Sequence, residues 1–190
     1  MSAMFSAVRR PRRFVYVSLL LTVWLFVSGS VTACTASNAP PPTAWEVLAV
    51  MQNTMRESAQ TLPDGCTYTR AVAPDDPAYL SDILLTALMG EAAPELTVDG
   101  VDPAPIGDIA LFLSETPYPC ELAVLRCSDA RSTTTAAKLC RARLDTLRRA
   151  YARTEWADLV ERGTVSVQGS YVLLVVCEDP RSVVRGAGVG

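Results

Sequence analysis

Residues 171–177 read Tyr-Val-Leu-Leu-Val-Val-Cys, an uninterrupted apolar run. Only a strand that is covered on both faces of a sheet tolerates such a run, because apolar and polar residues alternate along a half-exposed strand. Val165-Ser166-Val167 and then the pair Gly169-Ser170, which is typical of a tight turn, come directly before it. The stretch therefore predicts a β-hairpin whose second strand is central in the sheet.

A long amphipathic helix is the clearest element upstream of this hairpin. It is opened by Ser128 or Asp129 and is expected to end at about Thr154. The helical spacing of its apolar residues places one set on a single face: Ala136, Cys140, Leu144, Leu147 and Tyr151. We expect this face to pack against the sheet.

Two more strands and two more helices are expected before the long helix. Apolar runs at 109–113 and 122–125 predict strands that are separated by residues 117–119, Pro-Tyr-Pro. Helices are expected at 44–59 and 77–89. The predicted fold class is α+β, with a small, mainly antiparallel sheet whose β-β-α-β-β core is packed by one long helix and preceded by two others.

The N-terminus has the order of a lipoprotein signal peptide, which we assign to residues 1–33. Basic residues come first, followed by the apolar stretch 14–27 and then by small residues. Residues 31–34 read Val-Thr-Ala-Cys, which matches a bacterial lipobox. Cleavage is expected between Ala33 and Cys34, and the thiol of Cys34 would take up diacylglycerol as a thioether.

Two alternatives for the leader stay open. Residues 14–33 are close to the ~20 residues that span a bilayer, so the leader can be an uncleaved membrane helix. It can also be a simple secretion signal that is removed without lipidation. All three interpretations place the rest of the chain outside the cytoplasm.

The remaining chain divides into three parts by composition. Residues 34–43 form a proline-rich tether, residues 44–180 a single α+β domain, and residues 181–190 a flexible tail. Four of the 17 basic residues lie in the leader, so 13 basic and 20 acidic residues follow it, a net charge of −7. This balance argues against nucleic-acid binding, which depends on clustered cations.

Histidine is absent from the chain, and this limits the chemistry that it can perform. Ser-His-Asp and Cys-His mechanisms are excluded, as are metal sites that use imidazole. No C-x-x-C pair is present, which argues against a zinc ribbon and a thioredoxin-type motif. We assign no catalytic residue, no metal ligand and no cofactor.

Five cysteines remain after the leader, at positions 66, 120, 127, 140 and 177. Cys120 and Cys127 would lie on opposite faces of a strand and should not bridge each other. Cys127 and Cys177, each at the end of an apolar strand, are the candidate disulfide if those strands are neighbours. The alternative is that all five are small buried hydrophobic residues.

Two weaker patterns could serve a hydrolase. Thr135 and Lys138 have the spacing of the S-x-x-K dyad of penicillin-recognising enzymes, without its companion motifs. Glu115 and Glu121 flank the Pro-Tyr-Pro turn and could act as an acid–base pair. Ordinary helix surface and solvated turn residues are the plainer interpretations.

Residues 106–180 resemble a family of bacterial lipoprotein domains that is catalogued as a domain of unknown function. Three features carry the resemblance: Cys-Glu-Leu-Ala-Val-Leu at 120–125, Arg143 with Tyr151 in the long helix, and Gly-Ser-Tyr-Val-Leu-Leu-Val-Val at 169–176. The resemblance implies a lipobox, a short linker, helices and a β-β-α-β-β core. It implies no catalytic residues.

These observations together lead to an expected function. The chain is expected to be a lipid-anchored protein on the extracytoplasmic face of the cell membrane, and a non-enzymatic binding or accessory module of the cell envelope. Its expected partners are the membrane, through the lipid anchor, and an envelope protein or ligand that the sequence does not identify. The alternative is an envelope hydrolase or wall-modifying enzyme that uses carboxylates or the Thr135–Lys138 pair.

Overall fold

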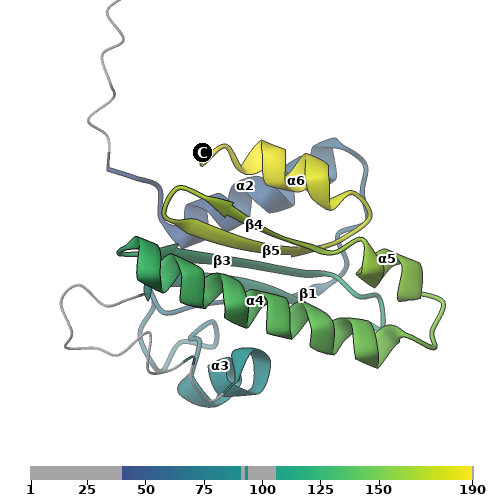
Figure 1. Ribbon diagram of the computed structural model, residues 1–190, viewed down its shortest axis with the longest axis horizontal. Coiled ribbons are helices and arrows are strands. Elements are labelled where there is room, and N and C mark those ends of the chain that lie inside the picture. The colour runs from purple at the N-terminus through teal and green to yellow at the C-terminus, as the bar shows by residue number, and fades with distance from the viewer. Residues whose placement is uncertain (1–39, 91–92, 94–105, 190) are drawn as a thin grey trace, which may run out of the picture. The chain divides into compact units, whose positions relative to one another are not determined.

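The computed structural model describes residues 40–90, 93 and 106–189 (Figure 1). The chain divides into two compact units between Pro40 and Pro41, and the described fold belongs to the second. Its helices are α2 (Ala44–Glu57), α3 (Asp82–Met89), α4 (Ala130–Tyr151), α5 (Ala157–Glu161) and α6 (Pro180–Ala187). Its strands are β1 (Gly65–Thr69), β2 (Ile106–Ser114), β3 (Glu121–Cys127), β4 (Thr164–Gln168) and β5 (Tyr171–Val176).

The five strands form one antiparallel sheet in the order β1-β2-β3-β5-β4. The predicted β-β-α-β-β core is confirmed, with α4 joining the β2–β3 hairpin to the β4–β5 hairpin. Every residue of β5 is buried, and the strand lies between β3 and β4. The apolar run at 171–177 therefore forms an interior strand, as its composition predicts.

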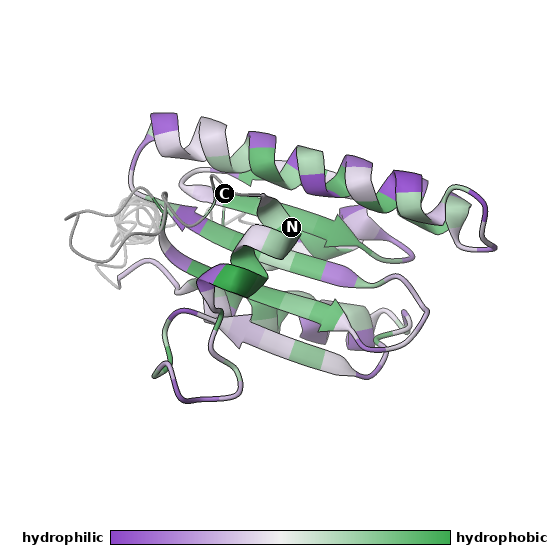
Figure 2. Ribbon diagram, turned by 90° about the horizontal axis from the view of Figure 1, so that it is seen from below, coloured by the Kyte–Doolittle hydropathy of each residue, from purple (hydrophilic) through white to green (hydrophobic). Residues whose placement is uncertain are grey.

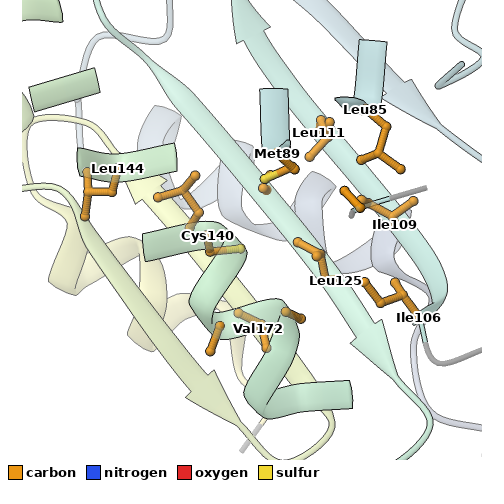
Figure 3. Packing of buried hydrophobic residues seen from close by; sticks show 14 of the residues in the cluster. Leu85, Met89, Ile106, Ile109, Leu111, Leu125, Cys140, Leu144 and Val172 are labelled. Carbon is orange, nitrogen blue, oxygen red and sulfur yellow. The ribbon is translucent and has the colours of Figure 1, made fainter. Parts of the chain in front are cut away.

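Helices cover both faces of the sheet (Figure 1). On one face α4 and α3 pack against the odd-numbered core residues of β2 and β3 (Figure 3). Figure 3 shows this layer, with Cys140 of α4 near Leu125 and Val172 of the sheet. In Figure 2 the interior strands are mostly hydrophobic, whereas α4 carries both hydrophobic and hydrophilic residues, as an amphipathic helix does.

On the opposite face α2 and α6 pack side by side (Figure 1). Their buried side chains meet Phe112, Leu122 and Leu173 of the sheet. Thr43 begins α2 with a reciprocal capping box, in which its hydroxyl accepts the N–H of Glu46 and the Glu46 carboxylate accepts the N–H of Thr43. Tertiary contact fixes the same end, because the N–H of Ala44 donates to the buried Asp108 carboxylate of β2 at 2.6 Å.

The segment between α2 and β2 differs from the prediction in two ways. Residues 65–69, where the sequence predicts neither a helix nor a strand, form strand β1 and pair with β2. The second helix begins at Asp82 and not at Pro77. The N–H of Leu80, a fully buried residue, donates to the carbonyl of Thr69, the last residue of β1. This bond holds the chain in an extended form beside β1, so the helix begins only after Ser81, which caps it.

The prediction of a flexible tail at 181–190 is wrong. Residues 180–187 form α6, which Asp179 caps through the N–H of Ser182 and which starts with a proline. Val183 and Ala187 are buried against the α2 layer. Gly186 lies so close to α2 that an added Cβ would stand 2.5 Å from the Thr54 hydroxyl oxygen. The domain therefore extends past its predicted end at Pro180.

The leader, Cys34 and the tether up to residue 39 lie outside the described residues, as do most of residues 91–105. Within the part of the chain that is described, no helix has both the length and the apolar character needed to cross a membrane.

Candidate functional site

A small hollow of about 190 Å³ lies where the β2–β3 connection meets the second half of α4. Its wall combines hydroxyl groups, two tyrosine rings and one ion pair: Ser114, Thr116, Tyr118, Tyr151, Glu121 and Arg143. Ser114 is the last residue of β2, and the turn that follows supplies Thr116 and Tyr118, because Pro117 and Pro119 interrupt the strand pairing on either side of Tyr118.

A buried ion pair forms one wall of the hollow. The guanidinium group of Arg143 binds the Glu121 carboxylate through two nitrogens, with Nε–Oε1 at 2.9 Å and Nη2–Oε2 at 2.7 Å. The side chains are only 17% and 8% exposed, respectively. Two parallel hydrogen bonds fix the plane of the guanidinium group. In the described residues Nη1 of Arg143 has no hydrogen-bond partner, so this nitrogen is a donor held in a fixed orientation.

Tyr118 forms the neighbouring wall. Its hydroxyl donates to Oε1 of Glu178 at 3.0 Å, and Thr61 donates to the same carboxylate oxygen at 2.7 Å. Its ring meets the ring of Trp156 edge to face, with the centroids 4.9 Å apart. Partial burial, followed by the hydrogen bond to Glu178, raises the pKa of Tyr118 to about 12. The phenol therefore stays protonated at neutral pH and ties the turn to the end of β5.

The two glutamates that flank the turn do not converge. Glu121 faces the hollow in its ion pair, whereas Glu115 is exposed and accepts a hydrogen bond from the Cys66 thiol at 2.9 Å. This hydrogen bond raises the pKa of the Cys66 thiol. The hollow is thus lined by one carboxylate, and that carboxylate is already bound by a cation.

The Thr135–Lys138 pair lies on α4 and is not part of the hollow. The hydroxyl of Thr135 donates to the backbone carbonyl of Arg131 at 3.1 Å, the usual bond of a threonine within a helix. Lys138 is exposed. The described geometry shows no activating contact between the two side chains.

The cysteine pairing predicted from the sequence is wrong. β3 and β5 are neighbours, but they run antiparallel, so Cys127 and Cys177 lie at opposite ends of the ladder. They also lie on opposite faces, Cys127 in the core under α4 and Cys177 in the core under α2. All five described cysteines are free thiols in this structure. Within the described ranges, no cluster of Cys, Asp and Glu side chains has the makings of a metal site.

A second, larger hollow of about 460 Å³ contains residues that the sequence did not single out. It is lined by Arg70 and Arg126, two of the three basic residues between Cys34 and Cys127. Arg70 is paired with Asp82 and lies over the ring of Tyr79, and Arg126 lies 3.9 Å from Asp108. Since carboxylates already face both cations, an anion would have to compete with them for this site.

Comparisons of the chain with protein-family models, with curated proteins and with solved structures find no match.

Proposed function

We propose that this chain is an exported lipoprotein that Cys34 anchors to the extracytoplasmic face of a bacterial cell membrane. The observation that carries this proposal is the order of basic, apolar and small residues that ends at Cys34. The start of the fold agrees with it, because Thr43 caps the first helix of the domain directly after the proline-rich tether. Two or three acyl chains, at about 0.8 kcal/mol per buried methylene, would hold the domain at the membrane.

The substitution Cys34→Ala tests the anchor. We expect the variant to incorporate no fatty-acid label and to keep its leader, because the lipobox peptidase acts on the lipidated cysteine. Metabolic labelling with an alkyne fatty acid and the mass of the N-terminal peptide measure both effects. Cys66→Ala, which changes a cysteine of the folded domain, should behave like the unchanged chain. Unaltered labelling and processing in Cys34→Ala would refute the lipoprotein assignment.

We further propose that the anchored domain is a non-enzymatic binding module, and that the hollow beside α4 holds its partner. A volume of about 190 Å³ is smaller than the roughly 300–1,000 Å³ of small-molecule sites, so a side chain or chain terminus of a protein fits better than a cofactor. The Nη1 donor of Arg143, in a hollow that Tyr151 also lines, suits a carbonyl or carboxylate next to an apolar group.

The family resemblance is part of this proposal. Glu121, Arg143 and Tyr151 belong to the motifs that carry the resemblance, although they are far apart in the sequence. All three line the same hollow, which supports a shared role for them. The alternative of a hydrolase has less support, because Arg143 already binds the only carboxylate among the described residues that line the hollow, and Thr135 donates to a carbonyl.

Site-specific photocrosslinking on intact cells tests the binding proposal. A benzophenone amino acid at position 151 should give one discrete adduct, whereas the same group at the 84% exposed position 83 should not. Adding Thr116→Trp, which fills the hollow from an exposed turn position, should abolish the adduct at position 151. Equal adducts from both positions, or an adduct that survives the tryptophan, would contradict a partner in the hollow.

A further inference from the structure

Cys120 and Cys177 occupy adjacent positions at one end of the sheet. The last pair in the β3–β5 ladder is Glu121 with Val176. Because the strands are antiparallel, the next residue outward on β3 is Cys120 and the next on β5 is Cys177, so continued register sets these two opposite each other. Both side chains belong to the core under α2, which means that they point to the same face.

The alternation of hydrogen-bonded and non-hydrogen-bonded residue pairs along the ladder determines how far apart Cys120 and Cys177 lie. The N–H of Cys127 donates to the carbonyl of Ser170 at 2.8 Å, which makes Cys127 and Ser170 a hydrogen-bonded pair. The two kinds of pair alternate along an antiparallel ladder, so Cys120 and Cys177 fall on a non-hydrogen-bonded position. Opposed Cα atoms there lie about 4.5 Å apart, within the roughly 4.4–6.8 Å that a disulfide requires.

The local sequence explains why the regular ladder stops one residue earlier. Pro119 has no N–H with which to extend the bonding pattern past Cys120. The two cysteines are therefore next to a ladder end but still within the apolar core, with 2% and 0% of their surfaces exposed.

We propose that Cys120 and Cys177 form a disulfide in the mature protein, linking the start of β3 to the end of β5. This inference rests on the proposed export of the chain, because disulfides form and persist outside the cytoplasm. Cys127 and Cys140 lie in the other core, under α4, and are separated from this pair by the sheet.

The bond forms during folding by exchange with an oxidised dithiol oxidoreductase. The two S–H bonds and the enzyme's S–S bond break, one S–S bond forms between Cys120 and Cys177, and the two electrons and two protons convert the enzyme's disulfide to its dithiol. Burial raises the pKa of both thiols to about 12, so few thiolates remain once the domain has closed. Oxidation must therefore precede burial of the pair.

Peptide mapping of the full chain, exported from bacterial cells, tests this bond. Membranes are denatured in N-ethylmaleimide and digested without reductant, and the N-terminal peptide is sequenced to establish export. We expect one linked peptide that contains Cys120 and Cys177, with the maleimide on Cys66, Cys127 and Cys140. Alkylated Cys120 and Cys177 in a chain whose leader has been removed would overturn the inference.

A refolding arm separates failure of this bond from failure of the proposed export. Reduced, denatured full chain is refolded in a mixture of reduced and oxidised glutathione and mapped in the same way. A Cys120–Cys177 peptide that forms here, when the cellular chain retains its leader, supports the bond and refutes the proposed cleavage before Cys34. If the chain refolds to its native circular dichroism spectrum and this peptide is absent, the proposed bond is wrong, whether or not the chain is exported.

Stability gives an independent measurement. Reduction of the refolded chain should lower Tm by roughly 5–15 °C, because a long loop is released. Cys120→Ala/Cys177→Ala should lose this sensitivity to reductant, and Cys127→Ala should retain it. An equal response to reductant in the two variants would contradict the assignment.

Discussion

Replacing Arg143 with alanine is expected to destabilise the domain by about 3–5 kcal/mol. The Glu121 side chain is 8% exposed in the folded domain and would lose its only charged partner among the described residues, since Arg143 donates all of its described side-chain hydrogen bonds. Desolvation of an unpaired charge costs more than the ion pair contributes, which is why one-sided removal has so large an effect. Urea denaturation at neutral pH, followed by circular dichroism, measures the loss.

Two matched variants show whether the unpaired charge is the cause. Arg149→Ala removes an exposed arginine from the same helix. The side chain of Arg149 has one described hydrogen bond, to Thr146, so the substitution should lower the free energy of unfolding by less than about 1 kcal/mol. Glu121→Leu/Arg143→Leu removes both charges and should recover most of the stability. A double variant as unstable as Arg143→Ala would mean that packing, and not charge, explains the loss.

Shortening either leucine in the middle of β5 to alanine is expected to cost about 2–5 kcal/mol. Leu173 points into the core under α2 and Leu174 into the core under α4, and neither has any exposed surface. Each substitution removes buried methyl groups and leaves a cavity that the neighbouring strands cannot close. Equilibrium unfolding in urea measures the free energy of unfolding of both variants. The dependence of this free energy on urea concentration, the m-value, should be the same as in the unchanged chain.

Val167 provides the control on the neighbouring strand. It lies on β4 and is 47% exposed, so Val167→Ala should change the free energy of unfolding by less than about 0.5 kcal/mol. A small loss of stability in Leu173→Ala together with a large loss in Leu174→Ala would contradict the conclusion that helices pack tightly on both faces of the sheet. It would show that the α2–α6 layer contributes little to the stability of the sheet.

The parts of the fold that the sequence predicts are those whose signals are local. The apolar run at 171–177, the Gly169-Ser170 turn and the stripe on α4 each indicate an element without reference to any other part of the chain. Strand β1 gives a weaker signal, because it is short and half-buried, and its pairing with β2 bridges a long sequence separation. The start of α3 was placed too early because the contact between Leu80 and Thr69 is also non-local.

The predictions of a flexible tail and of the cysteine pairing are wrong for related reasons. α6 is a helix of eight residues whose stability comes from packing on α2, and so its sequence alone resembles a polar end. The apolar strands that carry Cys127 and Cys177 are neighbours, as the pairing required. What the sequence could not supply was the face and the end of the ladder on which each sulfur lies.

The candidate site could be predicted only as separate residues. Glu121 stood out beside the Pro-Tyr-Pro turn, and Arg143 and Tyr151 stood out through the resemblance. Their meeting depends on the angle at which α4 crosses β3, which no local pattern encodes. Tyr118 and its bond to Glu178 could not be anticipated at all, because Glu178 lies beyond the end of the last strand.

The position of β5 in the sheet has a consequence for biosynthesis. β5 and α6 follow every other described element along the chain, yet β4 has no partner other than β5 among the described strands. A nascent chain that lacks them cannot complete either hydrophobic layer, so the domain does not fold until β5 and α6 have been synthesised. An extended polypeptide is the form that a narrow translocation pore admits, so under the proposed export this strand order would favour crossing of the membrane before folding.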